Sequence, residues 1–595
     1  MSTLAELRRE LLAYERNTSL RLSPDGLSIG FVRTVDAGQE LWLRTADGAE
    51  ERLAAHHGEM LADLRWATDG TTLLYRATQR GREAWRLLAF RCAGQGQVEL
   101  ADRVSEYWLS VDDPDAVVYC SRGELYRVRL GGQPEQVAQS AGYHRWLVDG
   151  SLRPRGGTRF TRSGSLQVLL GEDPGAARVV LEIDVEGVVD LAIAGFGRDG
   201  RRLYLLTSHG AKTRRLITID AASAVVTTVF EDPELDVDSY PIAGEGVWFD
   251  PTTGEPDLCA VMDQRLRYRP LGPGPRAALA VLARTPDEPL VLVDRSADDR
   301  TWLVVQVRDD GPIRYRLFSP GTGRFREVFV NRPGLSGRRL PRLADFHFVT
   351  GDGWKLGGYL MRPLDTNPPL PTVVMVHGGP AGRDLWRFHA DAQYLASLGY
   401  LSLHVNYRGS KGFGIDFRQA GNGEWGGRMQ DDLYEALGAG VAAGLVDPAR
   451  TAFLGASYGG YASLLAACLR PDLVRCAVAI SAPCDLVSFV EKPPVYWQPL
   501  SILLQRQVGR AGLEQRSPQH VLTPRCAPVL LAHGTRDPRV PIAEMDRFAA
   551  RAEEIGVPVR YLRFADEGHH VRSNVNRVRL FAAIKDFLEE HLADR

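Results

Sequence analysis

The sequence predicts two domains, an all-β propeller followed by an α/β domain. Three observations support this fold class. A turn-and-strand unit recurs over residues 20–335, strands alternate with helices over residues 336–595, and a Gly-x-Ser-x-Gly motif separates a strand from a helix in the second region. Together they indicate a β-rich domain joined to a catalytic domain.

The composition is that of an ordinary globular protein. The chain has 595 residues, of which 44% are hydrophobic and 25% charged, and its formal net charge is −2. This charge gives no reason to expect nucleic acid or an anionic membrane as a partner. No stretch reaches the roughly 18 apolar residues of a membrane span. The first residues show no apolar signal segment, so we expect a cytoplasmic protein.

The seven cysteines do not follow a ligand or disulfide pattern. None lies in C-x-x-C spacing and their number is odd. This disfavours a disulfide framework and a zinc site, and it fits a reducing compartment. From the sequence we expect no cofactor and no metal.

Residues 1–19 are predicted to form a separate N-terminal element. Four leucines between Thr3 and Tyr14 recur at helical spacing: Leu4, Leu7, Leu11 and Leu12. A short amphipathic helix must bury its apolar face, and we expect it to dock on the second domain.

Residues 20–335 are predicted to form a seven-bladed β-propeller. A turn rich in Asp and Gly precedes a short apolar strand at five places: residues 22–32, 66–75, 111–119, 197–206 and 296–305. The first three units recur every 44 residues or so, a spacing typical of a four-stranded blade. At that period the region contains about seven blades. The units near Leu147 and Val247 are degenerate, and a pair of β-sandwiches is the alternative.

Residues 336–595 are predicted to form the α/β domain. After two strands near residues 344–350 and 356–361, apolar strands are expected at 372–376, 401–405, 451–454, 476–480, 528–532 and 557–564. Helices are expected at 386–398, 429–443, 459–469, 542–555 and 576–592. Buried strands separated by helices are typical of a parallel sheet covered on both faces.

The strongest motif is Gly455-Ala-Ser-Tyr-Gly459. It follows the apolar strand at 451–454 and precedes a helix, which is the context of a nucleophile elbow in an α/β-hydrolase. A serine at such an elbow lies on a strained turn, where neighbouring side chains would collide. The small residues Gly455, Gly459 and Gly460 meet that requirement, so Ser457 is the candidate nucleophile.

Two later loops supply the partners that a serine nucleophile needs. Asp537 follows the strand at 528–532 and His569 follows the strand at 557–564, in the order nucleophile, acid, histidine. We assign His569 as general base and Asp537 as the group that orients it. His570 is the alternative base, and Asp566 is the alternative acid.

An acyl-transfer site also needs N–H donors for the oxyanion. The candidates are the backbone N–H groups of Tyr458 and Gly379, the latter in a glycine-rich loop after the strand at 372–376. We interpret His377 in this loop as a residue that fixes the loop rather than as a second base.

Six stretches together resemble the prolyl oligopeptidase family of serine peptidases, and most closely its acylaminoacyl-peptidase branch. They are VHGGP (376–380), NYRGSKGFG (406–414), EWGGRMQDD (424–432), GASYGGYAS (455–463), HGTRDPRVP (533–541) and DEGHH (566–570). The resemblance implies a peptidase whose propeller limits access to short peptides, and it supports the triad Ser457, Asp537 and His569.

The same resemblance suggests residues that contact the substrate. Arg539 matches the arginine that holds a substrate carbonyl in the prolyl oligopeptidase branch, and Val540 would line the pocket for the side chain before the cleaved bond. Tyr496 and Trp497 are candidates for that pocket or, equally, for the core. The oxyanion tyrosine of the family's dipeptidyl-peptidase and prolyl-oligopeptidase branches is absent, and His377 stands in its place.

The substrate class leaves alternatives. No paired-glutamate motif that would bind a free peptide N-terminus is evident, which disfavours a dipeptidyl aminopeptidase. Arginines far outnumber lysines, so a carboxypeptidase that binds the peptide C-terminus through arginines is one alternative. An esterase and a non-catalytic propeller scaffold are the others. We expect short peptides as substrates, no nucleic acid or membrane partner, and a homo-oligomer.

Overall fold

The computed structural model describes residues 4–13, 17–35, 38–80, 82, 84–92, 94, 96–282 and 289–593. The chain divides into two compact units. One contains residues 1–14, 308–312 and 332–595, and the other contains residues 15–307 and 313–331. We call them the hydrolase unit and the propeller unit and describe each by itself.

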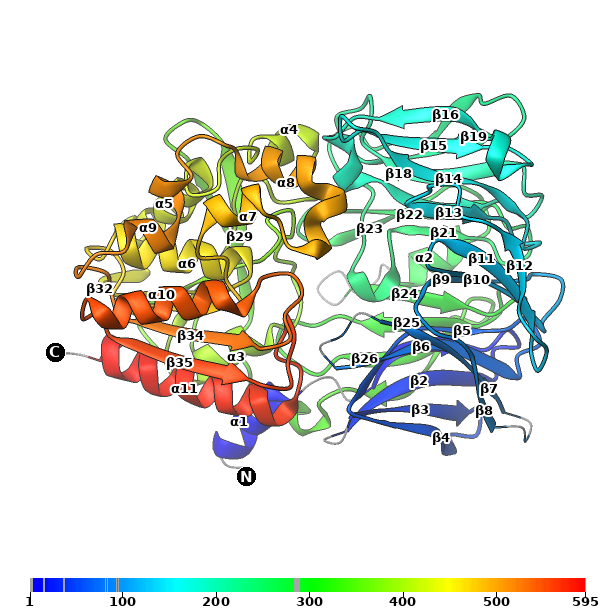
Figure 1. Ribbon diagram of the computed structural model, residues 1–595. Helices are drawn as coiled ribbons and strands as arrows, with labels where there is room; N and C mark the ends of the chain where they lie inside the picture. The colour runs from blue at the N-terminus through cyan, green and yellow to red at the C-terminus, as the bar shows by residue number, and fades with distance from the viewer. Residues whose placement is uncertain are drawn as a thin grey trace. The chain divides into compact units, whose positions relative to one another are not determined.

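The propeller unit contains seven antiparallel sheets that follow one another along the chain, as Figure 1 shows by colour. Blade 1 contains β1 (Asn17–Leu22), β2 (Ser28–Val35), β3 (Gly38–Thr45) and β4 (Glu50–His57). Blade 2 contains β5 (Glu59–Trp66), β6 (Thr72–Gln79), β7 (Arg86–Arg91) and β8 (Gly96–Ala101). Blade 3 contains β9 (Val104–Leu109), β10 (Ala116–Ser121), β11 (Glu124–Arg129) and β12 (Glu135–Ala138).

The remaining blades continue this order. Blade 4 contains β13 (Arg145–Val148), β14 (Pro154–Phe160), β15 (Leu166–Leu170) and β16 (Arg178–Ile183). Blade 5 contains β17 (Ala192–Phe196), β18 (Arg202–Thr207), β19 (Arg215–Asp220) and β20 (Val226–Phe230). Blade 6 contains β21 (Val247–Phe249), β22 (Pro256–Met262) and β23 (Leu266–Pro270), and α2 (Arg276–Leu282) follows it. Blade 7 contains β24 (Leu290–Arg295), β25 (Trp302–Gln306), β26 (Arg314–Ser319) and β27 (Arg324–Val330).

The recurring aspartate turn has a common hydrogen bond. In all five units a carboxylate oxygen accepts from the backbone N–H two residues later: Asp25 from Leu27, Asp69 from Thr71, Asp113 from Asp115, Asp199 from Arg201, and Asp298 from Arg300. Each of the five units leads into the second strand of its blade, namely β2, β6, β10, β18 and β25. The seven-bladed propeller predicted from the sequence is therefore confirmed. The degenerate units are the first strands of blades 4 and 6.

Each blade is built from consecutive strands, so no blade combines strands from both ends of the unit. The ring of blades is closed instead by hydrogen bonds between blades 1 and 7. The backbone N–H of Leu22 in β1 donates to Asp294 of β24 over 2.9 Å. Asn17 and Asn331, near the two ends of the unit, pair through two hydrogen bonds of 3.1 and 2.9 Å. These bonds join residues more than 270 positions apart and fix the last blade against the first.

The hydrolase unit is built on an eight-stranded sheet with helices on its faces (Figure 1). The strand order is β28 (Leu343–Val349), β29 (Lys355–Met361), β31 (Leu401–Asn406), β30 (Leu370–Val376), β32 (Val446–Ala456), β33 (Cys476–Ile480), β34 (Val529–Gly534) and β35 (Val559–Phe564). The first two strands pair antiparallel, and the pairs from β31 to β35 are parallel. The predicted α/β-hydrolase domain is confirmed.

The helices of this unit are α1 (Leu4–Leu12), α3 (Ala390–Ser397), α4 (Ile415–Gln419), α5 (Arg428–Ala442), α6 (Tyr458–Leu469), α7 (Leu486–Glu491), α8 (Ser501–Val508), α9 (Pro518–Val521), α10 (Ile542–Glu554) and α11 (Asn574–Leu592). Short 3₁₀ turns occur at η1 (Pro174–Ala176), η2 (Gly187–Asp190) and η3 (Pro241–Ala243) in the propeller unit, and at η4 (Pro333–Leu335), η5 (Val495–Leu500) and η6 (Glu514–Arg516) in the hydrolase unit. Four of these helices, α4 and α7 to α9, were not predicted, because they are short and lie in connections between strands.

None of the described helices has the length and apolar character needed to cross a membrane.

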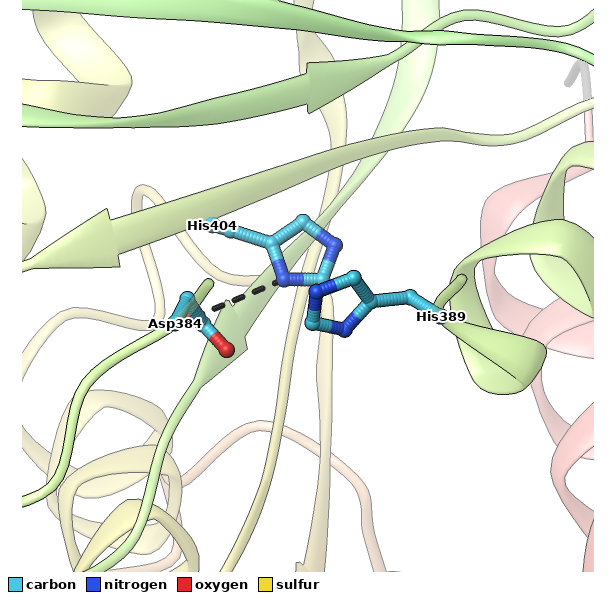
Figure 2. Close-up of side chains that lie close together, drawn as sticks. All are labelled: Asp384, His389 and His404. Atoms are coloured by element: carbon cyan, nitrogen blue, oxygen red, sulfur yellow. Dashed lines mark ion pairs between the residues drawn. The ribbon is translucent and has the colours of Figure 1, made fainter. Parts of the chain in front are cut away.

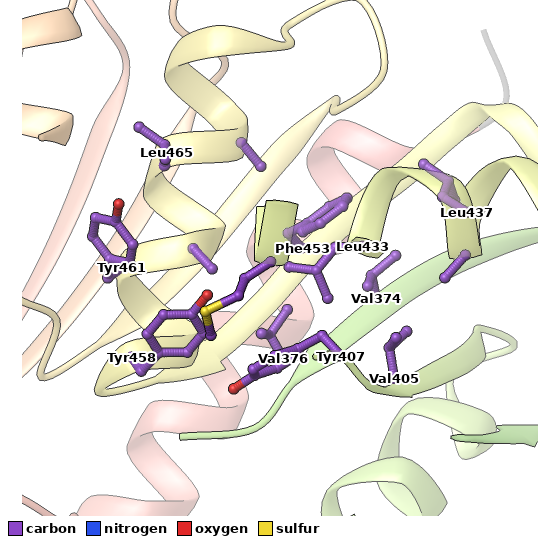
Figure 3. Close-up of a cluster of buried hydrophobic side chains, with 14 of the residues drawn as sticks. Val374, Val376, Val405, Tyr407, Leu433, Leu437, Phe453, Tyr458, Tyr461 and Leu465 are labelled. Carbon is purple, nitrogen blue, oxygen red and sulfur yellow. The ribbon is translucent and has the colours of Figure 1, made fainter. Parts of the chain in front are cut away.

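The sheet buries a core on each face because successive strand residues point in opposite directions. Val374 of β30 packs in one cluster with Leu433 of α5, which Figure 3 shows. Its neighbour Val373 packs in another cluster with Phe581 of α11. This near-continuous apolar pattern explains why the strands were recognisable in the sequence.

The N-terminal helix α1 belongs to the hydrolase unit. Leu12 joins the cluster that contains Phe581, and Leu11 packs with Phe388. Arg8 donates to the carbonyl oxygen of Ser397 at the end of α3 over 2.8 Å. Thr3 and Tyr14, the predicted ends of this helix, lie outside the described residues.

Candidate active site

Ser457 occupies the turn between β32 and α6. Its backbone has φ 58° and ψ −122°, a conformation that costs a non-glycine residue energy. A Cβ on Gly459 would lie 2.0 Å from the carbonyl oxygen of Val376, and a Cβ on Gly455 would lie 2.4 Å from Gly459. The turn therefore requires glycine on both sides of the serine, as expected of a nucleophile elbow.

The residue after the serine anchors the elbow in the core. The side chain of Tyr458 is fully buried, and its ring meets that of Trp425 edge-on at 4.7 Å (Figure 3 shows Tyr458 beside Tyr461). Its backbone N–H is the first of α6, and the first N–H groups of a helix have no acceptor within the helix. That N–H is the candidate oxyanion donor at the serine.

The glycine-rich loop after β30 runs beside this elbow. A Cβ on Gly378 would lie 3.1 Å from the carbonyl oxygen of Ala456 and 3.6 Å from Cβ of Ser457. The next residue, Gly379, has φ +131°, which suits glycine. Gly379, the second predicted oxyanion donor, therefore directly follows Gly378, which lies close to the turn that contains Ser457.

His377 is held by several contacts of this loop. Its Nε2 lies 3.0 Å from the hydroxyl of Ser410, and its Nδ1 lies 3.0 Å from the carbonyl oxygen of Gly378. The ring stacks on Tyr407 with centroids 4.3 Å apart. Burial lowers the pKa of His377, so the ring is neutral at pH 7. These contacts are those of a residue that fixes the loop.

The carboxylate of Asp537 and the imidazole of His569 form a direct hydrogen bond. Asp537 follows β34 and His569 follows β35, and His569 Nδ1 lies 2.7 Å from Asp537 Oδ2. Both side chains are buried. Because a carboxylate can only accept, Nδ1 carries the proton and Nε2 keeps the lone pair. The parallel strands place this pair and Ser457 at the same carboxyl edge of the sheet.

The electrostatics of Asp537 favour its ionised form. Burial by itself would raise the pKa of this carboxyl group, but hydrogen bonds from His533 and His569 outweigh it and hold the pKa below its usual range. The other oxygen, Oδ1, accepts from the backbone N–H of Arg539 at 2.8 Å and of Val540 at 3.1 Å. A carboxylate with this many donors stays charged and keeps its orientation.

The alternative assignments are placed differently. His570 is exposed, and its ring meets His569 edge-on at 5.1 Å. Asp566 accepts from the side chain of Asn576 at 2.9 Å. The structure thus joins His569 with Asp537.

Two residues without an assigned role in the sequence analysis support the pair. His533 Nε2 lies 3.1 Å from Asp537 Oδ2 and 3.0 Å from the carbonyl oxygen of Val540. Glu567, fully buried, accepts from the backbone N–H groups of Arg572 and Ser573. Both belong to the motifs that contain the triad, but a motif does not show which atoms its neighbours contact.

The four predicted substrate residues lie together beside the acid. The guanidinium of Arg539 lies 4.9 Å from the centre of the Tyr496 ring, and the indole N–H of Trp497 donates to the carbonyl oxygen of Arg539 over 3.1 Å. Tyr496 is 37% exposed, whereas Trp497 packs against the apolar cluster and Val540 is buried. Of the two aromatic residues, Tyr496 has the exposure that a substrate contact needs.

This geometry defines a class of protein: a serine hydrolase in which an α/β-hydrolase unit is combined with a seven-bladed propeller. Comparison with known proteins identifies the family. The model of the prolyl oligopeptidase family matches residues 386–595, a range that contains Ser457, Asp537 and His569.

Similar proteins extend the match to the whole chain. Dipeptidyl aminopeptidase BIII of Pseudoxanthomonas mexicana is 30% identical over 624 aligned residues, which cover 99% of this chain and 88% of that protein. The acylamino-acid-releasing enzyme of Arabidopsis thaliana is 30% identical over 208 residues, 33% of this chain and 27% of that one. A solved puromycin hydrolase structure is similar in fold, with TM-score 0.76, 22% identity and coverage of 99% and 96% of the two chains. The chain belongs to the prolyl oligopeptidase family and is a serine peptidase.

Proposed function

We propose that the protein hydrolyses short peptides through an acyl-enzyme formed on Ser457. The observation that carries this proposal is the 2.7 Å hydrogen bond between Asp537 and His569 at the sheet edge where the elbow presents Ser457. That bond leaves the lone pair of His569 on Nε2, the nitrogen that must accept the hydroxyl proton.

The steps follow from these positions. His569 takes the proton of Ser457 Oγ as the oxygen bonds to the substrate carbonyl carbon, and the N–H groups of Tyr458 and Gly379 stabilise the resulting oxyanion. His569 then gives the proton to the leaving amine as the peptide bond breaks. Water, deprotonated by the same imidazole, attacks the acyl-enzyme and restores the free serine.

We propose a preference for N-terminally blocked or short internal peptides. In this proposal the propeller admits only short chains to the active site. The resemblance to acylaminoacyl-peptidases supports this preference, as does the lack of an evident paired-glutamate motif. Arg539 would hold a substrate carbonyl, with Val540, Tyr496 and Trp497 around the side chain before the cleaved bond. The contact between Arg539 and Tyr496 favours a joint role for these two residues.

The second candidate is removal of dipeptides from a free N-terminus. It is favoured by one observation, the alignment of a protein named dipeptidyl aminopeptidase over nearly the whole chain. The two candidates differ in the peptide N-terminus that they need. Removal of dipeptides requires a free, charged amine, whereas the first candidate accepts a blocked N-terminus.

A fluorophosphonate probe tests the nucleophile. The probe should label the wild-type protein, and Ser457→Ala should abolish labelling, with Ser463→Ala on the same helix as the control. A wild-type protein that is folded but unlabelled would exclude the mechanism.

A peptide panel then tests the substrate class. It should combine free and acetylated N-termini, free and amidated C-termini and a range of lengths, with products identified by mass spectrometry. Cleavage of acetylated peptides supports the first candidate. Release of dipeptides from free N-termini alone supports the second, and a strict need for a free C-terminus supports a carboxypeptidase. Turnover of small esters without any peptide cleavage would leave an esterase.

A further inference from the structure

Three potential metal ligands lie together, two in the connection between β30 and β31 and one in β31 itself. Figure 2 shows Asp384, His389 and His404 with their side chains directed toward one another. One donor atom from each side chain lies within 4.8 Å of the others. In the part of the chain that the structure describes, no other group of three His, Cys, Asp or Glu residues has this spacing.

The sheet and a side-chain clamp fix two of these residues. His404 is in β31, where it is paired with Tyr359 of β29 on one side and Met375 of β30 on the other, and it is 2% exposed. The backbone of Asp384 is held to the end of the same strand, because its N–H donates to Asn406 over 2.7 Å and its carbonyl accepts from Asn406 over 3.2 Å. Asp384 and His404 are therefore held on one strand end.

His389 completes the group at the start of α3. Its Nε2 lies 2.7 Å from the carbonyl oxygen of Leu385, and its ring lies 5.0 Å from that of His404. A metal-binding histidine is usually oriented by such a hydrogen bond at its other nitrogen. Binding at Nδ1 would keep this bond, whereas binding at Nε2 would release the proton and bring the Leu385 carbonyl next to the ion as a fourth ligand.

The hydrogen bonding of the group is incomplete. Oδ2 of Asp384 is buried without a hydrogen-bond partner, although it lies 3.5 Å from Nδ1 of His404. Nε2 of His404 is also buried without a partner. Nδ1 faces the carboxylate of Asp384, and an ion bound there would replace the Nδ1 proton and leave the ring protonated at Nε2. A buried carboxylate oxygen without a partner is costly, and a cation between these donors would remove that cost.

The distances suit a small tetrahedral ion. Ligands at the roughly 2.0–2.1 Å typical of zinc are about 3.3 Å apart in a tetrahedron, close to the 3.5 Å between Asp384 and His404. Donors up to 4.8 Å apart must approach by about 1.5 Å, a movement available to His389 because it is only partly buried and begins a helix.

We propose that Asp384, His389 and His404 bind one divalent transition-metal ion, with Zn²⁺ the best match to two imidazoles and a carboxylate. The ion would join the loop of residues 377–389 to β31. That loop contains Gly379, so the ion would stiffen the segment that supplies one of the two proposed oxyanion donors.

Zinc binding tests the site directly. Untagged full-length protein, stripped with a chelator, is titrated with Zn²⁺ in competition with a chromophoric chelator, and Co²⁺ serves as a visible-absorption probe of the ligand geometry. We expect one Zn²⁺ per chain and a rise in the melting temperature with added Zn²⁺. Asp384→Asn and His389→Ala should each weaken binding at least tenfold and remove the rise.

His520→Ala is the matched control, because His520 also lies beside a carboxylate, 3.2 Å from Asp485, but forms no group of three ligands among the described residues. It should bind Zn²⁺ as the wild type does. Circular dichroism of the metal-free variants must match the wild type, and His389→Ala changes only a partly buried side chain. A wild type that binds no Zn²⁺, binding that survives both substitutions, or binding lost only in His569→Ala would overturn the proposal.

Discussion

The imidazole of His533 donates to the same carboxylate oxygen of Asp537 that accepts from His569. The two donor distances are 3.1 and 2.7 Å. His533 also reaches the carbonyl oxygen of Val540, so it ties the acid to the turn that follows. A second histidine thus helps to orient the carboxylate of Asp537, which makes His533 a positioning residue.

His533→Ala should therefore reduce kcat by about tenfold with little change in KM, because the acid loses a fixed orientation while substrate contacts remain. His533→Asn, which keeps one N–H donor, should recover part of the loss. Steady-state kinetics on one peptide substrate decide this. A fall in kcat/KM that comes from KM alone would show that the residue acts on binding instead.

Arg539→Ala should raise KM for peptides tenfold or more, since a hydrogen bond from a charged group contributes about 1.5–3 kcal/mol. A small ester with no second carbonyl should be hydrolysed as before. Tyr496→Phe is the control, because it keeps the ring that lies 4.9 Å from the guanidinium. An equal loss on the ester would indicate that Arg539 instead supports Asp537 through the turn.

Glu567→Gln should lower the free energy of unfolding by about 2 kcal/mol and reduce activity. The buried carboxylate accepts from two backbone N–H groups and from Asn576, and an amide would turn one acceptor into a donor facing donors. Asp566→Asn, at the exposed neighbouring position, should have little effect. Denaturant unfolding measures both variants, and equal stabilities would disprove the role of Glu567.

Glu544 should make stability fall as the pH rises through neutrality. Burial raises the pKa of this α10 carboxyl group from 4.5 to about 7, although backbone N–H groups of Cys484 and Asp485 partly oppose the shift. A raised folded-state pKa means that the contribution is complete below pH 4.5 and is lost as the pH passes 7.

Between pH 5.5 and 8.5 the wild type should therefore lose about 2 kcal/mol relative to Glu544→Gln, which cannot ionise. Denaturant unfolding at a series of pH values gives the difference. Parallel curves for the two proteins would contradict the prediction.

The fold was largely predictable because its signals are local. An aspartate that accepts from the N–H two residues later needs only a short stretch of sequence, and it recurs in the turns before β2, β6, β10, β18 and β25. Blades 4 and 6 were harder to recognise because β13 has four residues and β21 has three. The parallel strands were clear because both of their faces are buried.

The site was only partly predictable because its remaining contacts depend on loops that meet in space. The sequence around residue 533 does not indicate that its side chain forms a hydrogen bond with Asp537. The sequence around residue 567 does not indicate that its side chain accepts hydrogen bonds from two backbone N–H groups. The spacing of the cysteines predicts no metal site, and it carries no information about aspartate and histidine side chains. Asp384, His389 and His404 come together only when the crossover returns to β31.

Because α1 belongs to the hydrolase unit, the order of synthesis limits when that unit can finish folding. The ribosome synthesises this helix before the propeller, yet Leu12 packs against Phe581, which is added more than 560 residues later. Until then the nascent helix has only part of its native contacts, such as those with Phe388 and Ser397, while the propeller can fold from residues already synthesised. Completion of the hydrolase unit is thereby postponed until α11 has left the ribosome, after the whole propeller has been synthesised.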